Sequence, residues 1–434
     1  MIDKIKKYGD RLIFALALTI LAAGLVRYIA GSIGAVNKEE EVPPVVLVFS
    51  HWRQNFFDND VPSKDALAEL MREFEIAEGA EGAEIAVVVG IAEVAEVAED
   101  AEVVGIAGIA EVAEDAEDVE GAGVVGIVAD VIGVDMLWVS ELIERGVVDD
   151  EWQFSDPVPL LSYMNLLFYN VDILTQAGFV MPPRNRTEFL NYARAVSVEN
   201  SRWGIGMALG SYRGIYDDIF PWLWAAGSVL VNDNRPAVNV RQVIDSLTFL
   251  ADLNNEGLIA PGFFNACSSQ KLDDFISGRT VFMIASERDI RYVREHMGDE
   301  AFSVTSIPVP DNYAGRSFSS ASEWTVAVNP ASENIEEARL FANFLFENTP
   351  LLAERTGTVS SGFSPRPGDD PHYSKVWDIA ITAEMANDFK GLPWVPLEEI
   401  FREELIALFA GDATPASTTA AVQRRWLVVL DGGI

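Results

Sequence analysis

The sequence predicts an α/β fold with mixed sheets, because segments of two kinds alternate along most of the chain. Short runs rich in Val, Ile and Leu are typical of buried strands, and the first covers residues 45–50. Between such runs lie longer segments whose apolar residues recur at helical spacing, as in residues 64–75 after Ser63. With 434 residues, 49% of them hydrophobic, the chain can bury a large core in two or three domains.

Charge and cysteine content exclude several kinds of partner and site. The net charge is −36, from 67 acidic residues against 31 Lys and Arg, whereas nucleic acids and anionic membrane surfaces are bound by basic patches. Cys267 is the single cysteine, so the chain has neither an intramolecular disulfide nor a cysteine metal cluster. We therefore expect no nucleic-acid partner, no metal and no cofactor.

The first 36 residues predict export. Four basic residues precede an apolar run over residues 12–26. As a helix this run spans about 22 Å, less than the roughly 30 Å hydrocarbon core of a bilayer, and such a pattern is typical of an export signal. Residues 1–36 are therefore expected to be either a cleaved signal peptide or an uncleaved membrane anchor, followed by a polar linker over residues 37–44.

Residues 77–133 form a low-complexity acidic tract. Gly-Ile-Ala-Glu-Val-Ala-Glu occurs at residues 90–96 and again at 108–114, and the tract contains no Lys or Arg. A calcium site is not indicated, because no loop in the tract has the spaced ligands and turn glycine of a calcium-binding loop. The tract predicts a strand, an acidic helix and a second strand, which cover residues 85–89, 91–120 and 124–128.

The alternation continues beyond the tract. A strand running into Asp135 is followed by a helix that ends at Gly146, and a further strand leads into Tyr169 and Asn170. The helix over residues 334–347 carries its apolar residues on one face, and the helix over residues 397–409 is the last long one predicted. The other predicted elements cover residues 187–197, 204–210, 219–226, 240–254, 271–277 and 280–285.

A short helix is predicted within residues 217–231, with Pro221 near its first turn and Gly227 as its stop. At about 100° per residue, Phe220 and Trp224 share one face and Trp222 points away from it. We expect Trp224 in the core and Trp222 in a cleft, where an indole can stack on the apolar face of a sugar ring. The alternative is that both tryptophans are core residues, as aromatics at helical spacing usually are.

Several motifs occur in a characteristic order along the chain. They include Val-Leu-Val-Phe-Ser-His-Trp at 46–52, Leu-Leu-Phe-Tyr-Asn at 166–170, Phe-Pro-Trp-Leu-Trp-Ala-Ala-Gly at 220–227, Glu-Trp-Thr-Val-Ala-Val at 323–328 and Gly-Phe-Ser-Pro-Arg at 362–366. Their order resembles the family 1 extracellular solute-binding proteins, the sugar receptors of ABC importers, a class that includes maltose-binding protein.

This resemblance implies two α/β lobes of the type II periplasmic-binding-protein fold, with the ligand in a cleft between them. The crossing strands are expected near Val158, Ser322 and Thr358. The acidic tract departs from the family, which usually has a folded unit there, and Ser320-Ala321-Ser322 replaces a usual glycine pair. The expected first lobe holds residues 45–158 and 325–357, and the second holds residues 159–324 and 358–434.

The resemblance also implies a sugar site lined by aromatic side chains with a few polar partners. A carboxylate such as Asp135 accepts two hydroxyl hydrogens at once through charge-assisted bonds. Packing in the core is the alternative role for each tryptophan, and an ion pair in the hinge is the alternative for Arg366. The candidate ligand-binding residues are Trp52, Asp135, Trp138, Tyr163, Trp222, Trp224, Arg288, Trp324, Arg366 and Trp394.

By this resemblance the chain is an extracytoplasmic receptor that delivers a carbohydrate to the membrane permease of an ABC importer. We expect a monomer in the periplasm or cell envelope, touching the membrane through its N-terminal segment if that segment is not cleaved. We expect no enzyme activity: no Gly-x-Ser-x-Gly motif occurs, although the many acids leave a glycosidase open, since it needs only a carboxylate pair. A membrane-tethered ligand sensor and a degenerate relative that binds nothing are further alternatives.

Overall fold

The computed structural model describes residues 45–51, 70, 71, 73, 74, 85–89, 130–144 and 160–432, apart from 212, 316, 317, 357, 361–369, 383, 387 and 390. The N-terminal segment, the linker and most of the acidic tract lie outside these residues, as do Trp52 and Arg366. Within the described residues, no helix is both long and apolar enough to cross a membrane.

The largest sheet of the described residues is mixed, and its strands lie in the order β2-β1-β3-β10-β4-β8-β5. β9 and β11 also pair with β4, and β12 pairs with β10. A separate small hairpin is formed by β6 and β7. The bounds are β1 Val45–His51, β2 Ile85–Val89, β3 Val131–Asp135, β4 Leu161–Asn170, β5 Trp203–Gly206, β6 Val231–Asn232, β7 Arg235–Pro236, β8 Thr280–Ser286, β9 Phe302–Thr305, β10 Phe318–Val328, β11 Val359–Ser360 and β12 Glu384–Ala386.

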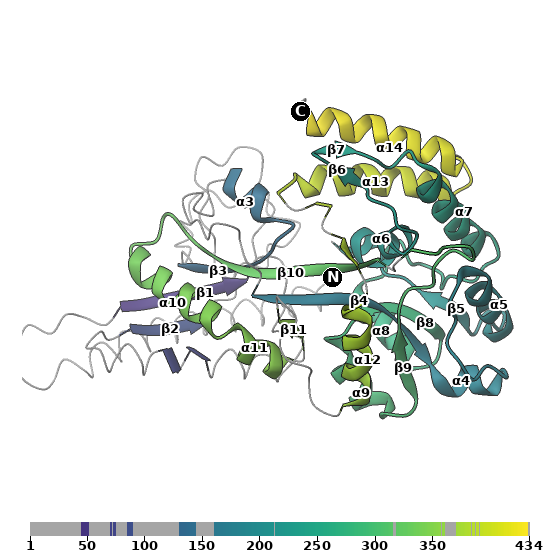
Figure 1. Cartoon of the computed structure of the whole chain (residues 1–434), viewed down its shortest axis with the longest axis horizontal. Coiled ribbons are helices and arrows are strands. Elements are labelled where there is room, and N and C mark those ends of the chain that lie inside the picture. Colours follow the sequence, from purple (N-terminus) through teal and green to yellow (C-terminus); the bar gives the residue numbers. More distant parts are fainter. Residues whose placement is uncertain are drawn as a thin grey trace, which may run out of the picture.

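Two long strands, β4 and β10, run between two groups of elements (Figure 1). The first part of β4 pairs with β10 through Leu161–Met164, and its second part, from Asn165, pairs with β8 and β9. β10 pairs with β12 up to Ser320 and with β3 from Trp324 onward. Each of these strands therefore belongs to both groups, which we call the first and second lobe.

The first lobe contains β1, β2 and β3 with α3 (Val139–Glu144), α10 (Ile335–Glu347) and α11 (Thr349–Thr356). α10 buries Ala338, Phe341, Ala342 and Leu345, the four apolar positions that repeat at helical spacing. The ring of Phe341 lies 5.1 Å from that of Phe74, and Trp324 of β10 is fully buried in the same core.

The second lobe contains β5, β8 and β9 and the remaining helices (Figure 1). Its largest core is aromatic: the rings of Tyr216, Phe220, Phe389 and Trp394 contact one another. The helices are α4 Val171–Gln176, α5 Arg186–Val196, η1 Ile215–Ile219, α6 Phe220–Trp224, α7 Arg241–Asn255, α8 Ser268–Ile276, α9 Asp289–Met297, α12 Pro371–Ala380, α13 Trp394–Phe409 and α14 Pro415–Leu430.

The sequence patterns did not predict the long helix α14. The last long helix that they predicted, over residues 397–409, corresponds to α13. The buried face of α14 consists of Thr418, Thr419, Val422 and Trp426, so half of its buried residues are polar. Hydrophobic periodicity is therefore weak there. The informative signal was its start, since Thr414 caps the helix and Pro415 occupies its first turn.

Candidate functional site

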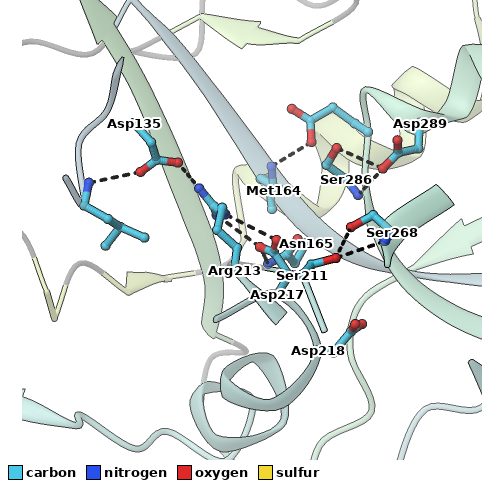
Figure 2. Close-up of polar contacts among 12 residues, drawn as sticks. Asp135, Met164, Asn165, Ser211, Arg213, Asp217, Asp218, Ser268, Ser286 and Asp289 are labelled. Carbon is cyan, nitrogen blue, oxygen red and sulfur yellow. Dashed lines mark hydrogen bonds and ion pairs between the residues drawn. The ribbon is translucent and has the colours of Figure 1, made fainter. Parts of the chain in front are cut away.

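A network of polar side chains lies where β3, β4 and the loop before η1 meet, at the junction of the lobes (Figure 2). Asp135 ends β3 in the first lobe, Asn165 lies on the crossing strand β4, and Arg213 and Asp217 belong to the second lobe. Because ligands of open α/β folds bind at the ends of strands, this junction is the candidate functional site.

Asp135 is fixed by its own backbone turn. Its Oδ1 accepts a hydrogen bond from Leu137 N at 3.0 Å, and its carbonyl accepts one from Trp138 N at 2.9 Å. Its Oδ2 accepts from Arg213 Nη1 in an ion pair. The carboxylate is only 1% exposed, so a positive partner is needed to offset its loss of hydration.

Arg213 is the centre of the network. Its Nη2 and Nε donate to the two oxygens of Asp217 at 3.0 and 3.2 Å, a two-pronged geometry that suits a guanidinium. The guanidinium also lies over the ring of Tyr216, 4.9 Å from its centroid. Asn165 Nδ2 donates to Asp217 Oδ1 at 3.3 Å, which connects the network to β4.

A second buried pair supports the same region from within the second lobe. Lys271 Nζ lies 2.8 Å from Asp218 Oδ1, and Ala208 N donates to Asp218 Oδ2 at 2.7 Å. Burial raises the pKa of the Asp218 carboxyl, and the neighbouring ammonium offsets this in part. The ion pair of Asp218 and Lys271 joins η1 to α8, and the contact with Ala208 N joins η1 to the loop after β5.

The crossing strand is held on its other side by the end of β8. Glu287 accepts from Met164 N at 2.6 Å, next to the point where β4 leaves β10 for β8. Asp289 accepts from both the backbone N and the hydroxyl of Ser286, at 3.1 and 3.2 Å. Arg288 is half-buried between these two acids at the start of α9.

The junction network combines hydrogen-bond acceptors and donors, the groups that a polar solute engages. Carboxylates at Asp135 and Asp217 accept hydrogen bonds, and the amide of Asn165 and the guanidinium of Arg213 donate them. In the described part of the chain, no group of three or more His, Cys, Asp or Glu side chains could hold a metal ion.

The structure corrects the expected orientation of Trp222. Its ring lies 5.0 Å from that of Phe189 and 5.2 Å from that of Phe249, and the side chain is fully buried. Trp224 points the other way, as expected, with its ring 5.0 Å from that of Tyr216. The prediction that Trp222 faces outward is therefore wrong, because every residue of α6 is buried and the helix has no open face.

The other candidate tryptophans that the structure describes, Trp138, Trp324 and Trp394, are also core residues. Trp138 is 3% exposed, Trp324 is fully buried in the first lobe, and Trp394 packs edge-on to Tyr216 at 5.6 Å. Tyr163 pairs through its backbone with Ser322, and its side chain lies outside the described residues. Of the candidates, Asp135 is the one that the described contacts bring into the network. Contact between these candidate residues and a solute stays a prediction.

Sequence reasoning missed Asn165, Arg213 and Asp217. A local signal existed for two of them, since Arg213 and Asp217 are four residues apart and such pairs share a helix face. No local signal joins Arg213 to Asp135, 78 residues away.

Comparison with known proteins places the chain in a family. The bacterial extracellular solute-binding protein family matches residues 110–349, more than half of the chain. The chain belongs to this family. The family is one of extracellular binding proteins, so membership implies a location outside the cytoplasm.

Individual relatives of this solute-binding protein are distant in sequence. A curated protein of Brucella abortus (strain 2308), named only as a binding protein, is 20% identical over 320 residues, which cover 66% of this chain and 76% of the relative. The solved GacH receptor of Streptomyces glaucescens, described in complex with acarbose, has a TM-score of 0.65 at 15% identity, covering 90% of this chain and 99% of its own.

Two further solved structures agree on the fold. Maltose-bound MalE3 of T. maritima has a TM-score of 0.63 at 15% identity and covers 88% of this chain and 99% of its own. An ABC transporter solute-binding protein of Thermotoga lettingae, bound with α-D-tagatose, has a TM-score of 0.64 at 17% identity, with coverage of 89% and 100%. The chain thus has the two-lobe solute-binding fold.

Proposed function

We propose that this solute-binding protein takes up a carbohydrate between its lobes and delivers it to an ABC transporter for import. The observation that carries the proposal is the interlobe network of Asp135, Asn165, Arg213 and Asp217, which offers both acceptors and donors at the junction. A sugar hydroxyl both donates and accepts a hydrogen bond, so it matches such a mixed set. The sugars bound by the three solved relatives support the same class of solute.

The proposal includes a location and a partner. The basic and apolar N-terminal pattern supports export, with residues 1–36 either removed or kept as a membrane anchor. The partner is the membrane permease of an ABC importer, and the receptor acts as a monomer. We propose lobe limits of 45–158 with 325–357 and 159–324 with 358–434, with crossings near Val158, Ser322 and Thr358.

Calorimetric titration with a panel of neutral sugars tests the proposal. Maltose, maltotriose, acarbose and tagatose are suitable members, and free amino acids serve as the non-sugar control. We expect saturable binding of at least one sugar and a matching rise in melting temperature, because a ligand that binds only the folded state stabilises it.

Three other outcomes would contradict parts of the proposal. Binding of amino acids but of no sugar would change the solute class. Release of smaller sugars from maltotriose would indicate a glycosidase. If no compound gives a heat of binding or a change in melting temperature, although the protein melts cooperatively, the protein is a degenerate relative that binds nothing.

The candidate acid is tested separately. Asp135→Asn keeps the shape of the side chain but removes its charge, and should weaken sugar binding because a charge-assisted hydrogen bond is lost. Glu256→Gln, at an exposed pair with Arg194 on the second lobe, is the matched control.

A further inference from the structure

The buried ion pair of Asp218 and Lys271 belongs entirely to the second lobe and adjoins Asp217 of the candidate site. Asp218 is in η1 and Lys271 in α8, and their side chains are 1% and 6% exposed. Lys271 Nζ donates to Asp218 Oδ1 at 2.8 Å, and Asp218 Oδ2 accepts from Ala208 N at 2.7 Å. We propose that this pair positions the solute-binding loop, defined as residues 208–217, and so sets the affinity for solute without touching the solute.

Asp217 is the group that the ion pair places. It precedes Asp218 in η1, but its carboxylate accepts three N–H bonds from other directions, one from Asn165 of β4 and two from Arg213 (Figure 2). A carboxylate has about four lone-pair positions. In the part of the chain that the structure describes, these donors therefore leave about one position for a solute hydroxyl. The side chain is 29% exposed, so a solute can reach it from the second lobe alone.

The turn that carries Asp217 and Asp218 has an uncommon geometry. η1 is a short π-helix, in which Phe220 N donates to the Ile215 carbonyl five residues back, and Gly214 at its start has no side chain to cap it. Such turns are rare in proteins and occur frequently at functional sites. Asp218 fastens this turn from outside, to the loop after β5 on one side and to α8 on the other.

The solute-binding loop is attached to the same part of the lobe. Leu209 N donates to the Phe263 carbonyl at 2.8 Å, and the hydroxyl of Ser211 accepts from Ser268 N at 2.9 Å. Ser268 begins α8, the helix that also carries Lys271. The loop and η1 are therefore fastened to one helix, and the ion pair is the contact that joins η1 to it.

A buried ion pair specifies position more than it stabilises a fold. The lost hydration of two buried charges largely offsets their attraction, so well-packed apolar residues of similar volume are often as stable in their place. Apolar residues lack the directional contacts of Asp218 with Lys271 and Ala208, however. Loss of the pair should therefore change the geometry of the loop more than the stability of the lobe, and an experiment can separate the two effects.

A double variant and a matched control separate positioning from stability. Asp218→Leu with Lys271→Met replaces both charges by apolar side chains of similar shape, which a core commonly tolerates. Lys271→Met alone leaves a buried carboxylate without its cation and can fail to fold, so the double variant decides the test. The control is Arg194→Gln with Glu256→Gln, which removes an exposed ion pair of the same lobe.

Hydrogen exchange without any sugar gives the first measurement. The amides of Leu209, Gly214 and Asp217 donate to backbone carbonyls at 2.8 or 2.9 Å, so their exchange reports the order of the loop. We expect exchange in residues 209–217 to be at least about tenfold faster in the double variant, as for loss of a hydrogen bond between charged groups. Exchange in α7, the reference helix, should equal that of the wild type, and the control variant should change neither segment.

Calorimetric titration with a sugar that the wild type binds gives the second measurement. The double variant should bind that sugar roughly 10- to 100-fold more weakly, because a displaced Asp217 loses one charge-assisted hydrogen bond to the solute. The control variant should bind it like the wild type.

Three results would overturn the proposal: unchanged exchange in residues 209–217, an equal acceleration in α7, or an unchanged sugar affinity. An equal acceleration in α7 would show that the pair only stabilises the lobe. The proposal rests on the proposed carbohydrate-binding function, but the two fail separately. If the wild type binds no sugar, the proposed function fails, whereas exchange in residues 209–217 still decides whether the pair positions the loop.

Discussion

Trp222 and Trp224 bury their indoles on opposite sides of α6, and among the residues that the structure describes only the Trp224 indole N–H has a hydrogen-bond acceptor. Trp224 Nε1 donates to Asp388 Oδ2 at 3.0 Å, and the same oxygen accepts from Leu230 N at 2.6 Å. Within the described residues, Trp222 Nε1 has no hydrogen-bond partner. The helical period predicted the opposite directions of these side chains, but it carries no information on what covers each side.

This difference predicts unequal effects of replacement by Phe. Trp224→Phe removes a hydrogen bond to the Asp388 carboxyl and should cost about 1.5–3 kcal/mol beyond the loss of ring contacts. Trp222→Phe loses a similar ring area but also removes a buried N–H group that has no hydrogen-bond partner in the described residues. Its loss of unfolding free energy should therefore be clearly smaller. Urea unfolding of both variants gives the comparison, and an equal loss of stability would refute the role of the Asp388 bond.

Replacement by Ala tests the core assignment of both residues. Each change should lower the free energy of unfolding by about 3–5 kcal/mol, as for other buried aromatics. Sugar affinity of the folded fraction should be unchanged in Trp222→Ala, because the Trp222 ring packs on Phe189 and Phe249, which lie outside the junction network. A Trp222→Ala protein that melts like the wild type but binds sugar weakly would contradict the core assignment and support a Trp222 ring that faces the cleft.

His372 predicts a pH dependence of stability. Its ring stacks on Phe302 at 4.4 Å, its Nε2 is 3.2 Å from the Phe302 carbonyl, and Arg294 Nη2 lies 3.1 Å from its Nδ1. Burial lowers the pKa of His372, and Arg294 and Lys375 lower it further against the opposing effects of the Phe302 carbonyl and Asp370. The unfolded chain therefore takes up a proton, near pH 6.5, before the folded protein does.

Stability from His372 is thus present above pH 6.5 and is lost as the pH falls toward the lower folded-state pKa. Unfolding by urea at pH 7.5 and 5.5 should show a smaller loss for His372→Gln than for the wild type. His296 is exposed on α9, so His296→Gln is the control and should behave like the wild type. Equal losses in all three proteins would contradict the prediction.

At the scale of elements, α14 depends on a cap rather than on a strong apolar pattern. The hydroxyl of Thr414 accepts from Ser417 N at 3.2 Å, while the hydroxyl of Ser417 accepts from Thr414 N at 2.8 Å. Trp426, three turns later, donates to the Leu397 carbonyl at 2.8 Å and fixes α14 on α13. Capping and one tryptophan thus replace the hydrophobic stripe that identified α10 and α13.

Removing the cap should weaken the second lobe measurably. Thr414→Ala is expected to lower the free energy of unfolding by about 1 kcal/mol, because it leaves a backbone N–H of the first turn without its acceptor. Thr414→Ser keeps the hydroxyl and should retain most of the stability. If Ala and Ser give the same result in chemical denaturation, the hydroxyl is not the stabilising feature.

At the scale of the whole molecule, the order of motifs predicted the family and the two-lobe fold, but not the composition of the junction. Arg213 and Asp217 are local neighbours, whereas Asp135 with Arg213 and Asn165 with Asp217 are 78 and 52 residues apart. Such pairs are brought together only by the crossing strand and the packing of two lobes. Local patterns therefore pointed to aromatic residues, which fill the cores, and missed Asn165, Arg213 and Asp217, the polar residues that join Asp135 between the lobes.

The topology of the first lobe predicts that the acidic tract can be shortened. β2 and β3 both run parallel to β1 and flank it, so the chain between them must cross over β1. A parallel crossover needs only about a dozen residues or more. Deleting residues 97–107 leaves residues 90–96 and 108–130, which exceed that length.

The deletion should change the melting temperature little and leave sugar binding measurable, since the repeated apolar-Ala-acid triplets specify no single length. A deletion of the same size within α7, which the second-lobe core requires, is the control and should unfold the protein. If deleting 97–107 is equally destructive, the tract is an integral part of the first lobe.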